Sequence, residues 1–135
     1  MNEQEIEQEI QNAGLVAPRV KPEDLTANIV DTEYVKFVSK SGQVLRWAIL
    51  TTQSGYAVVG KPSVSVSREN DNDQIGRQVA YDNSRNELWP LMGYALKENL
   101  YWQHNGWKFG QKDLLQSVAS EVDKAHCAAN VDNVE

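Results

Sequence analysis

The feature that most constrains the fold is a change of hydrophobic period near residue 70. Before it, β-branched and aromatic residues cluster in four runs, residues 34–38, 44–52, 56–60 and 63–67. Turn-forming pairs separate these runs (Ser41-Gly42, Ser54-Gly55, Lys61-Pro62), and residues 70–102 then follow a helical period. This order predicts an α+β fold, in which a small antiparallel β-meander is packed by a long C-terminal helix. Ser67 is the candidate cap of that helix.

Shorter helices are expected on either side of this core. Residues 3–13 form a polar run that Gly14 should stop, and Pro22 should begin a second helix over residues 22–30. We therefore divide the chain into an N-terminal polar helix (1–14), a single α+β core domain (15–112) and a C-terminal segment (113–135). That last segment should contain a helix to about residue 125, followed by an acidic tail.

Two of the predicted strands have chemically distinct faces. Trp47 and Ile49 alternate with Arg46 and Ala48, so one face of this strand should meet the long helix. In residues 63–67, three serines alternate with two valines, which places the hydroxyl groups on one face. That face is either a half-exposed strand surface or the wall of a ligand site, with Ser65 at its centre.

Charge is unevenly distributed along the chain. The net charge is −6, and residues 1–12 and 113–135 each carry −4, which leaves the body between them at +2. A general nucleic-acid binder needs a concentrated basic face, so we exclude that class, while a small anionic ligand remains compatible with the middle of the chain.

The ends of the chain also bear on its compartment. The first residues are acidic and lack the apolar segment of a secretory signal, and no apolar run reaches membrane-spanning length. The single cysteine, Cys127, cannot form an intrachain disulfide. We expect a protein of the bacterial cytosol with no membrane partner.

The apparent catalytic motifs fail on inspection. Residues 55–62 nearly match a phosphate-binding P-loop, but Pro62 replaces the hydroxyl residue that would hold Mg²⁺, and the intervening residues read as a strand. His126 and Cys127 are adjacent rather than at metal-ligand spacing, and His104 is the only other histidine. We therefore expect no enzyme activity, no metal and no cofactor.

The long predicted helix carries one unusual stripe. At 100° per residue, one side collects Ile75, Val79, Asp82, Asn83, Asn86, Trp89, Gly93, Leu96 and Leu100. The stripe is apolar at both ends, but its middle holds an acid and two amides, and an unpaired buried polar group costs about 1–3 kcal/mol. Pro90 has no amide hydrogen, so the carbonyl of Asn86 also loses its helical partner, provided that the helix continues past Pro90.

A structural and a ligand-binding interpretation of this polar patch stay open. The asparagines could fix the register of symmetric helices, which would make the protein a homo-oligomer, or they could belong to a buried network filled by water. Alternatively, Asn83 and Asn86 could bind a polar, nucleotide-like ligand, with Arg77 and Arg85 close enough to approach a phosphate. Both interpretations hold together in a dimer that builds its site between chains.

Several short motifs give the chain a recognisable pattern. They are Pro18-Arg19-Val20 with Asp24 and Asn28-Ile29, Ser54-Gly55-Tyr56 with Gly60, Ser67-x-Glu69-Asn70, Ile75-Gly76-Arg77, Ala80, Asn83, and Trp89-Pro90-Leu91-x-Gly93-Tyr94-x-Leu96. Over residues 18–100 the chain thereby resembles the phage gene-49/gene-66 family of small tailed-phage proteins. The resemblance implies a phage or prophage accessory protein that acts in the cytoplasm of the infected host.

The chain is also similar to the anti-Thoeris signal sponges, which sequester cyclic ADP-ribose isomers made by bacterial immune TIR enzymes. Arg68 and Asp71 stand where the pattern of the gene-49/gene-66 family would place a proline and an aromatic residue, and Tyr81 or Tyr94 could supply the missing stacking surface. Two hypotheses follow. The first is a sponge that binds a cyclic nucleotide signal without turnover. The second is a protein–protein inhibitor of a host factor, in which the acidic ends mimic an acidic partner or steer the chain toward a basic one.

Overall fold

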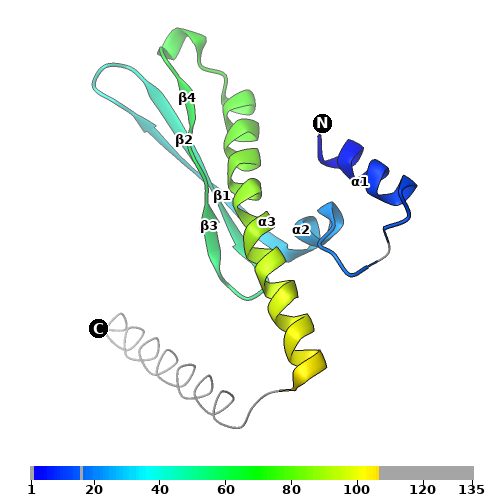
Figure 1. Ribbon diagram of the computed structural model, residues 1–135. Helices are drawn as coiled ribbons and strands as arrows, with labels where there is room; N and C mark the ends of the chain where they lie inside the picture. The colour runs from blue at the N-terminus through cyan, green and yellow to red at the C-terminus, as the bar shows by residue number, and fades with distance from the viewer. Residues whose placement is uncertain (1, 16, 107–135) are drawn as a thin grey trace, which may run out of the picture. The chain divides into compact units, whose positions relative to one another are not determined.

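The computed structural model describes residues 2–15 and 17–106 of the chain. The elements are α1 (Glu3–Asn12), α2 (Pro22–Asn28), β1 (Ile29–Val38), β2 (Val44–Thr52), β3 (Ala57–Val59), β4 (Ser63–Ser65), a 3-10 turn (Arg68–Asn70) and α3 (Asp73–Asn105). An antiparallel sheet lies beside one long helix (Figure 1), so the predicted α+β fold is confirmed. The helix predicted within residues 113–125 lies outside the described residues. Residues 1–97 form one compact unit, which contains the site discussed below.

The sheet is built around β2. β1 pairs with one edge of β2 along its whole length, and β3 and β4 share the other edge. β3 lies opposite residues 49–51 and β4 opposite residues 44–46, so the two short strands are successive parts of one track. The residues between them include Pro62, which has no amide hydrogen to give to a ladder. The predicted turns at Ser41-Gly42 and Ser54-Gly55 are present, and Gly42 (φ +92°) and Gly55 (φ +87°) have the left-handed backbone that favours glycine. The turn predicted at Lys61-Pro62 is absent, because β3 and β4 run in the same direction along β2 and the chain does not reverse between them.

The boundary between α2 and β1 differs from the prediction. The helix expected over residues 22–30 ends at Asn28, and the strand expected from residue 34 begins at Ile29. Ile29 and Val30 are β-branched, and β-branched side chains favour strand over helix. The pairing register shifts between Ile29 and Asp31, which is where the chain passes from the helix into the sheet.

One face of β2 is buried against α3. The buried side chains alternate along the strand from Val44 to Thr52, and they include Ala48 and Leu50, both fully buried. Leu25 of α2 and Val58 of β3 complete this part of the core. The covered face is therefore the one that carries Arg46 and Ala48, whereas the larger Trp47 and Ile49 lie on the opposite face.

The α3 face that meets the sheet differs from the predicted stripe. The buried positions are Gly76, Ala80, Ser84 and Leu88, with Arg85 beside them. Ile75 is 63% exposed and Val79 is 43% exposed, so the expectation that these residues face the core is wrong. Periodicity locates large apolar residues, but here the helix lies so close to the strands that three of the four facing positions carry only Gly, Ala or Ser.

Ser84 and Gly60 show how close this approach is. The fully buried Ser84 hydroxyl donates to the Ala48 carbonyl at 2.5 Å and accepts from the Gly60 amide at 2.9 Å. A Cβ atom on Gly60 would overlap the backbone of Asn83 and Ser84. Gly60, which resembles a P-loop glycine in the sequence, therefore has a packing role.

The start of α3 and its continuation past Pro90 both bear on the prediction. Ser67 makes no capping hydrogen bond with its side chain, and α3 is capped instead by Asn72, whose side chain accepts from the Ile75 amide at 3.0 Å. The helix begins three residues later than predicted for this reason. Pro90 lies inside α3, so the helix does continue past it, and the carbonyl of Asn86 lacks its helical partner.

We predict that Gly60→Ala lowers the free energy of unfolding by about 1–3 kcal/mol, because the added methyl group must push α3 away from the sheet. Urea unfolding followed by circular dichroism measures the change. Gly93→Ala is the matched control: no atom lies within 4 Å of a Cβ there, and alanine should raise helix stability by about 0.5–1 kcal/mol. Equal stability of Gly60→Ala and wild type would contradict the close approach.

Candidate functional site

A buried arginine on the middle of α3 organises the most distinctive polar site. Arg85 is only 8% exposed. Its Nη2 donates to the Pro22 carbonyl at 2.8 Å and its Nη1 to the Thr26 hydroxyl at 3.2 Å. Both acceptors belong to α2, so the short helix fixes the orientation of the guanidinium group.

The remaining edge of this guanidinium faces a carboxylate from α1. The Nε atom of Arg85 lies 3.1 and 3.2 Å from the two carboxylate oxygens of Glu3. The indole Nε1 of Trp89, one helical turn along α3, donates to the same carboxylate at 3.2 Å. Burial lowers the pKa of Arg85, but the hydrogen bonds and charges of Glu3 and Tyr81 together outweigh burial and raise it above its ordinary value. Arg85 and Trp89 thus form a receptor for one anionic group.

Two cavities adjoin this receptor. A polar cavity of about 620 Å³ is lined by Asn2, Glu3, Gln4, Thr26, Tyr81, Asp82, Arg85 and Asn86. A more apolar one of about 360 Å³ lies between α1 and the segments beneath it, and Ile6, Ile10, Val20 and Trp89 are among its lining residues. Glu3 and Asn86 line both cavities, so they separate them. Amide, hydroxyl and guanidinium groups here could bind a ligand of nucleotide size.

Five residues are the main predicted ligand contacts (Ser65, Arg77, Asn83, Asn86 and Tyr94), and of these Asn86 alone lines this cavity. Arg85 and Tyr81, which the sequence also points to, line it as well. Asn83 is half-buried one turn away, and its amide donates to the Lys61 carbonyl at 3.1 Å, which ties α3 to the segment between β3 and β4. Tyr94 is 70% exposed farther along the helix. Among the described residues, the predicted five are therefore not gathered at one site.

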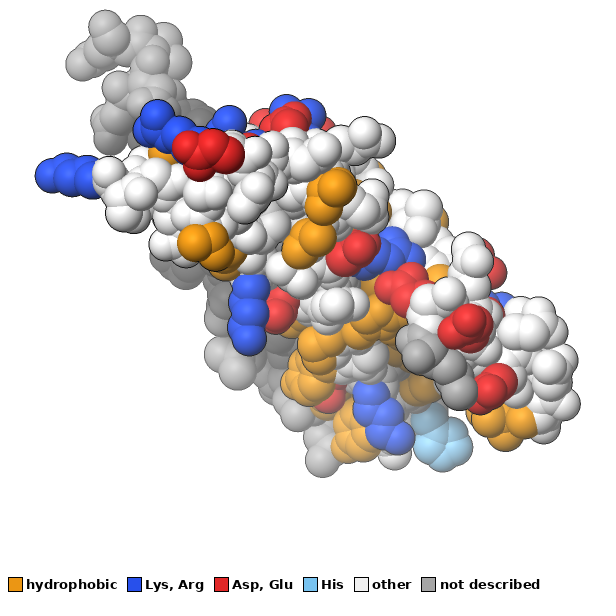
Figure 2. Space-filling view, turned by 90° about the horizontal axis from the view of Figure 1, so that it is seen from above, with side chains coloured by type: hydrophobic (Ala, Val, Ile, Leu, Met, Phe, Trp, Pro, Cys, Tyr) orange, Lys and Arg blue, Asp and Glu red, His pale blue; other side chains and the backbone are white. Residues whose placement is uncertain are grey.

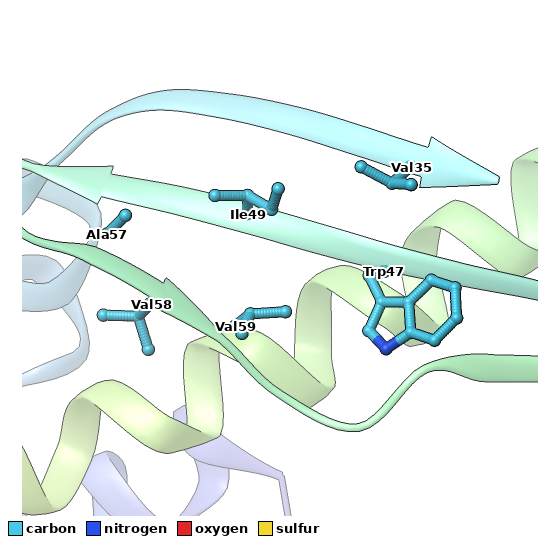
Figure 3. Close-up of a pocket in the computed structure, with 6 residues that line it drawn as sticks. All are labelled: Val35, Trp47, Ile49, Ala57, Val58 and Val59. Carbon is cyan, nitrogen blue, oxygen red and sulfur yellow. The ribbon is translucent and has the colours of Figure 1, made fainter.

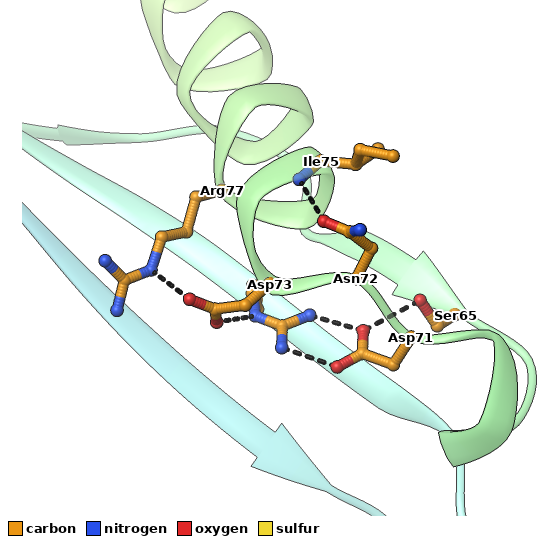
Figure 4. A network of polar contacts seen from close by, with 7 residues as sticks. Ser65, Asp71, Asn72, Asp73, Ile75 and Arg77 are labelled. Atoms are coloured by element: carbon orange, nitrogen blue, oxygen red, sulfur yellow. Dashed lines mark hydrogen bonds and ion pairs between the residues drawn. The ribbon is translucent and has the colours of Figure 1, made fainter.

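Ser65 and Arg77 belong to a network at the start of α3 (Figure 4). Arg46 is 2% exposed and binds both carboxylate oxygens of Asp71, at 2.5 and 2.6 Å. Ser65 donates to Asp71 at 3.0 Å, and Asp73 bridges Arg46 and Arg77, at 3.1 Å to each. Asp71, which stands where the family resemblance suggests an aromatic residue, thus anchors the arginine that joins β2 to α3.

Two bidentate arginine–carboxylate pairs favour the ionised form of their carboxyl groups. The hydrogen bonds from Arg46 lower the pKa of Asp71 to about 2, from an ordinary value of 3.8. The bidentate pair between Arg19 and Glu7 of α1 has the same effect, and the pKa of Glu7 falls to about 2 from 4.5. Charge-assisted bidentate pairs are among the strongest hydrogen bonds in proteins, so both pairs fix local geometry.

A second candidate surface is the sheet face turned away from α3. Val35, Trp47, Ile49, Ala57 and Val59 share this face and, together with Val58, line an apolar groove of about 320 Å³ (Figure 3). Phe37 and Val64 continue the same face, at 55% and 52% exposure. Apolar side chains of adjacent strands thus form a continuous exposed surface within the described residues.

A metal site, a membrane-spanning helix and a basic surface are three further features that could indicate a function within the described ranges. There, no three metal-ligating side chains come together, and no helix is long and apolar enough to cross a membrane. On the face seen in Figure 2, Lys and Arg side chains are dispersed and alternate with acidic ones. His126 and Cys127 lie outside the described residues.

The sequence contained part of the signal for the Arg85 site. Arg85 adjoins Asn86, and Trp89 follows at the i+4 spacing that places two side chains on one helix face. Glu3 and Thr26 were not found, because their contacts with Arg85 span 82 and 59 residues of chain. Local periodicity contains no information about such distant partners.

We predict that the free energy of unfolding falls as pH decreases from about 4.5 to 2. Asp71 and Glu7 have depressed pKa values, so their stabilisation is complete above the ordinary carboxyl range and is lost as pH falls toward 2. Asp71→Asn should lower stability at pH 7 and flatten this dependence. Urea titrations at a series of pH values measure both effects. Glu87→Gln, a change at an exposed acid, should leave the slope of the free energy of unfolding against pH unchanged. An equally steep slope in Asp71→Asn would show that the Arg46–Asp71 pair does not cause the acid destabilisation.

Comparison with known proteins adds one finding. The model of the phage protein (N4 Gp49/phage Sf6 gene 66) family matches residues 20–100, a segment that includes Arg85 and Asn86 but not α1. No curated protein and no solved structure matches the chain. The family match confirms the resemblance to gene-49/gene-66 proteins, and it does not extend to the anti-Thoeris sponges. Because the match covers more than half of its length, the chain belongs to the N4 Gp49/phage Sf6 gene 66 family of phage proteins.

Proposed function

We propose that this phage protein is an anti-defence accessory protein that binds a small anionic, nucleotide-like signal and holds it without turnover. The cyclic ADP-ribose isomers are the ligand class that we favour, and the cytoplasm of the infected host is where such a signal would be met. The observation that carries the proposal is the buried Arg85 guanidinium at the polar cavity beside Asn86.

The chemistry of Arg85 supports an anionic ligand. Arginine presents a planar, permanently charged set of donors that matches carboxylate and phosphate oxygens. Pro22 and Thr26 hold two of its nitrogen atoms, so α2 fixes the direction of the Nε donor, which Glu3 contacts in this structure. Such preorganisation reduces the entropy lost on binding.

The surroundings of Arg85 support a ligand larger than a lone anion. The cavity of about 620 Å³ lies within the range of small-molecule sites. Tyr81 offers an aromatic surface, and Asn86 offers its side-chain amide. Together these groups could contact a base and a ribose while Arg85 holds a phosphate.

We predict that Asn86→Leu weakens binding of a cyclic ADP-ribose isomer by roughly one to two decades, because one hydrogen bond of about 1–3 kcal/mol is lost. Since Asn86 is exposed, the melting temperature of the Asn86→Leu variant should differ little from that of the wild type. Isothermal titration calorimetry and thermal unfolding measure the two quantities.

Asn83→Leu is the matched control, one turn away on the same helix. It removes the bond to the Lys61 carbonyl, so it should lower stability and leave the dissociation constant nearly unchanged. If Asn86→Leu instead alters the oligomeric state on size exclusion while binding is unaffected, the asparagine fixes the register between chains and the ligand role is excluded.

A second candidate function, inhibition of a host protein, is favoured by the apolar face of the sheet. A sheet normally buries its hydrophobic face, and large exposed apolar patches mark interaction surfaces. The acidic N-terminus now gives weaker support to this candidate, because Glu3 and Glu7 are bound to arginines of the same chain. Self-association through this sheet face would be a different assembly from the homo-oligomer predicted through the asparagines of α3.

We predict that Val59→Lys abolishes association through this face without unfolding the protein, because Val59 is 54% exposed. Analytical ultracentrifugation of the purified protein detects self-association, and affinity capture from host lysate detects a host partner. Val66→Lys is the control, since Val66 lies beyond the end of β4 and is 85% exposed. Unchanged assembly and unchanged capture in Val59→Lys would exclude this surface.

A further inference from the structure

We propose that α1 is a displaceable plug, in which the Glu3 carboxylate occupies the anion position of the Arg85 site until an anionic ligand exchanges with it. This inference rests on the proposed function, because it describes how the same site is opened. It also narrows the ligand, which must present a compact anionic group such as a phosphate.

Glu3 has the geometry of a ligand group. Both of its oxygens lie within 3.2 Å of the Arg85 Nε atom, and one also accepts from the Trp89 indole. A phosphate oxygen could accept from the same two donors. The two donors lie on α3, and the other partners of Arg85 lie on α2 and α3, so removal of α1 leaves this receptor intact.

The apolar side of α1 packs poorly against the rest of the protein. Ile6, which should anchor an amphipathic helix, is 45% exposed, and a cavity of about 360 Å³ lies between α1 and Trp89. Glu3 and Glu7 provide the charged attachments, to Arg85 and Arg19. Well-packed helices leave no such void, so α1 is held mainly by two ion pairs.

Because Arg85 is buried, only an anionic ligand should displace α1 readily. A buried charge that loses its partner is strongly unfavourable, so α1 leaves readily only when another anion replaces Glu3. The fraction of molecules with α1 displaced therefore limits the apparent affinity, and any change that loosens α1 should strengthen ligand binding by the same factor.

The experiment compares the full-length protein with Glu3→Gln, using inorganic pyrophosphate as the probe. We expect Glu3→Gln to bind pyrophosphate at least tenfold more tightly than wild type in calorimetry. Hydrogen exchange should show faster exchange of the α1 amides in this variant, and in wild type after pyrophosphate is added. Glu9→Gln, an exposed acid on the same helix, removes the same charge and should behave as wild type.

Arg19→Gln serves as a second variant, because it breaks only the Glu7 attachment and leaves the Arg85 receptor unchanged. It should also speed α1 exchange and tighten pyrophosphate binding. If Glu3→Gln and Arg19→Gln both match Glu9→Gln in affinity and exchange, α1 is not a plug.

The two proposals fail differently. Tight binding of a cyclic ADP-ribose isomer with equal affinity in wild type and Glu3→Gln, while α1 stays protected, would overturn the plug and preserve the proposed function. Pyrophosphate binding that tightens in Glu3→Gln supports the plug, even if no cyclic nucleotide binds.

Discussion

The close seating of α3 on β2 is the constraint on which the rest of this structure depends. Gly76, Ala80 and Ser84 allow the helix to approach the strand until a side-chain hydroxyl bonds directly to the strand backbone. Gly60 extends the same approach to the segment after β3. Because so little volume lies between helix and sheet, the larger polar side chains of α3 point elsewhere, and Arg85 meets α2 and α1.

Two buried arginines show how the same residue type can serve different purposes. Arg46 is bound by Asp71 and Asp73, both adjacent to the start of α3, so its partners are part of the core connection. Arg85 takes its carboxylate from α1, a separate helix above an incompletely filled cavity. The first pair therefore stabilises the fold, and the second has the geometry of an exchangeable contact.

The candidate site was only partly accessible from the sequence. The polar interruption of the helical stripe contains Asn86, which lines the polar cavity together with Arg85. However, the hydrophobic pattern predicts the wrong core face for α3, because Ile75 and Val79 are hydrophobic but exposed. The true contact face consists of small residues, which contribute little to an apolar pattern but are required where backbones come close.

The sequence by itself determined the order of the described helices and strands, the two glycine turns and membership of the phage family. These follow from local periodicity, turn chemistry and short motifs, each of which involves residues close together in the chain. Only the tertiary structure decided which face of α3 is buried and which carboxylate meets Arg85. Those outcomes depend on how closely separate elements approach and on contacts such as Glu3 to Arg85, which join distant parts of the chain.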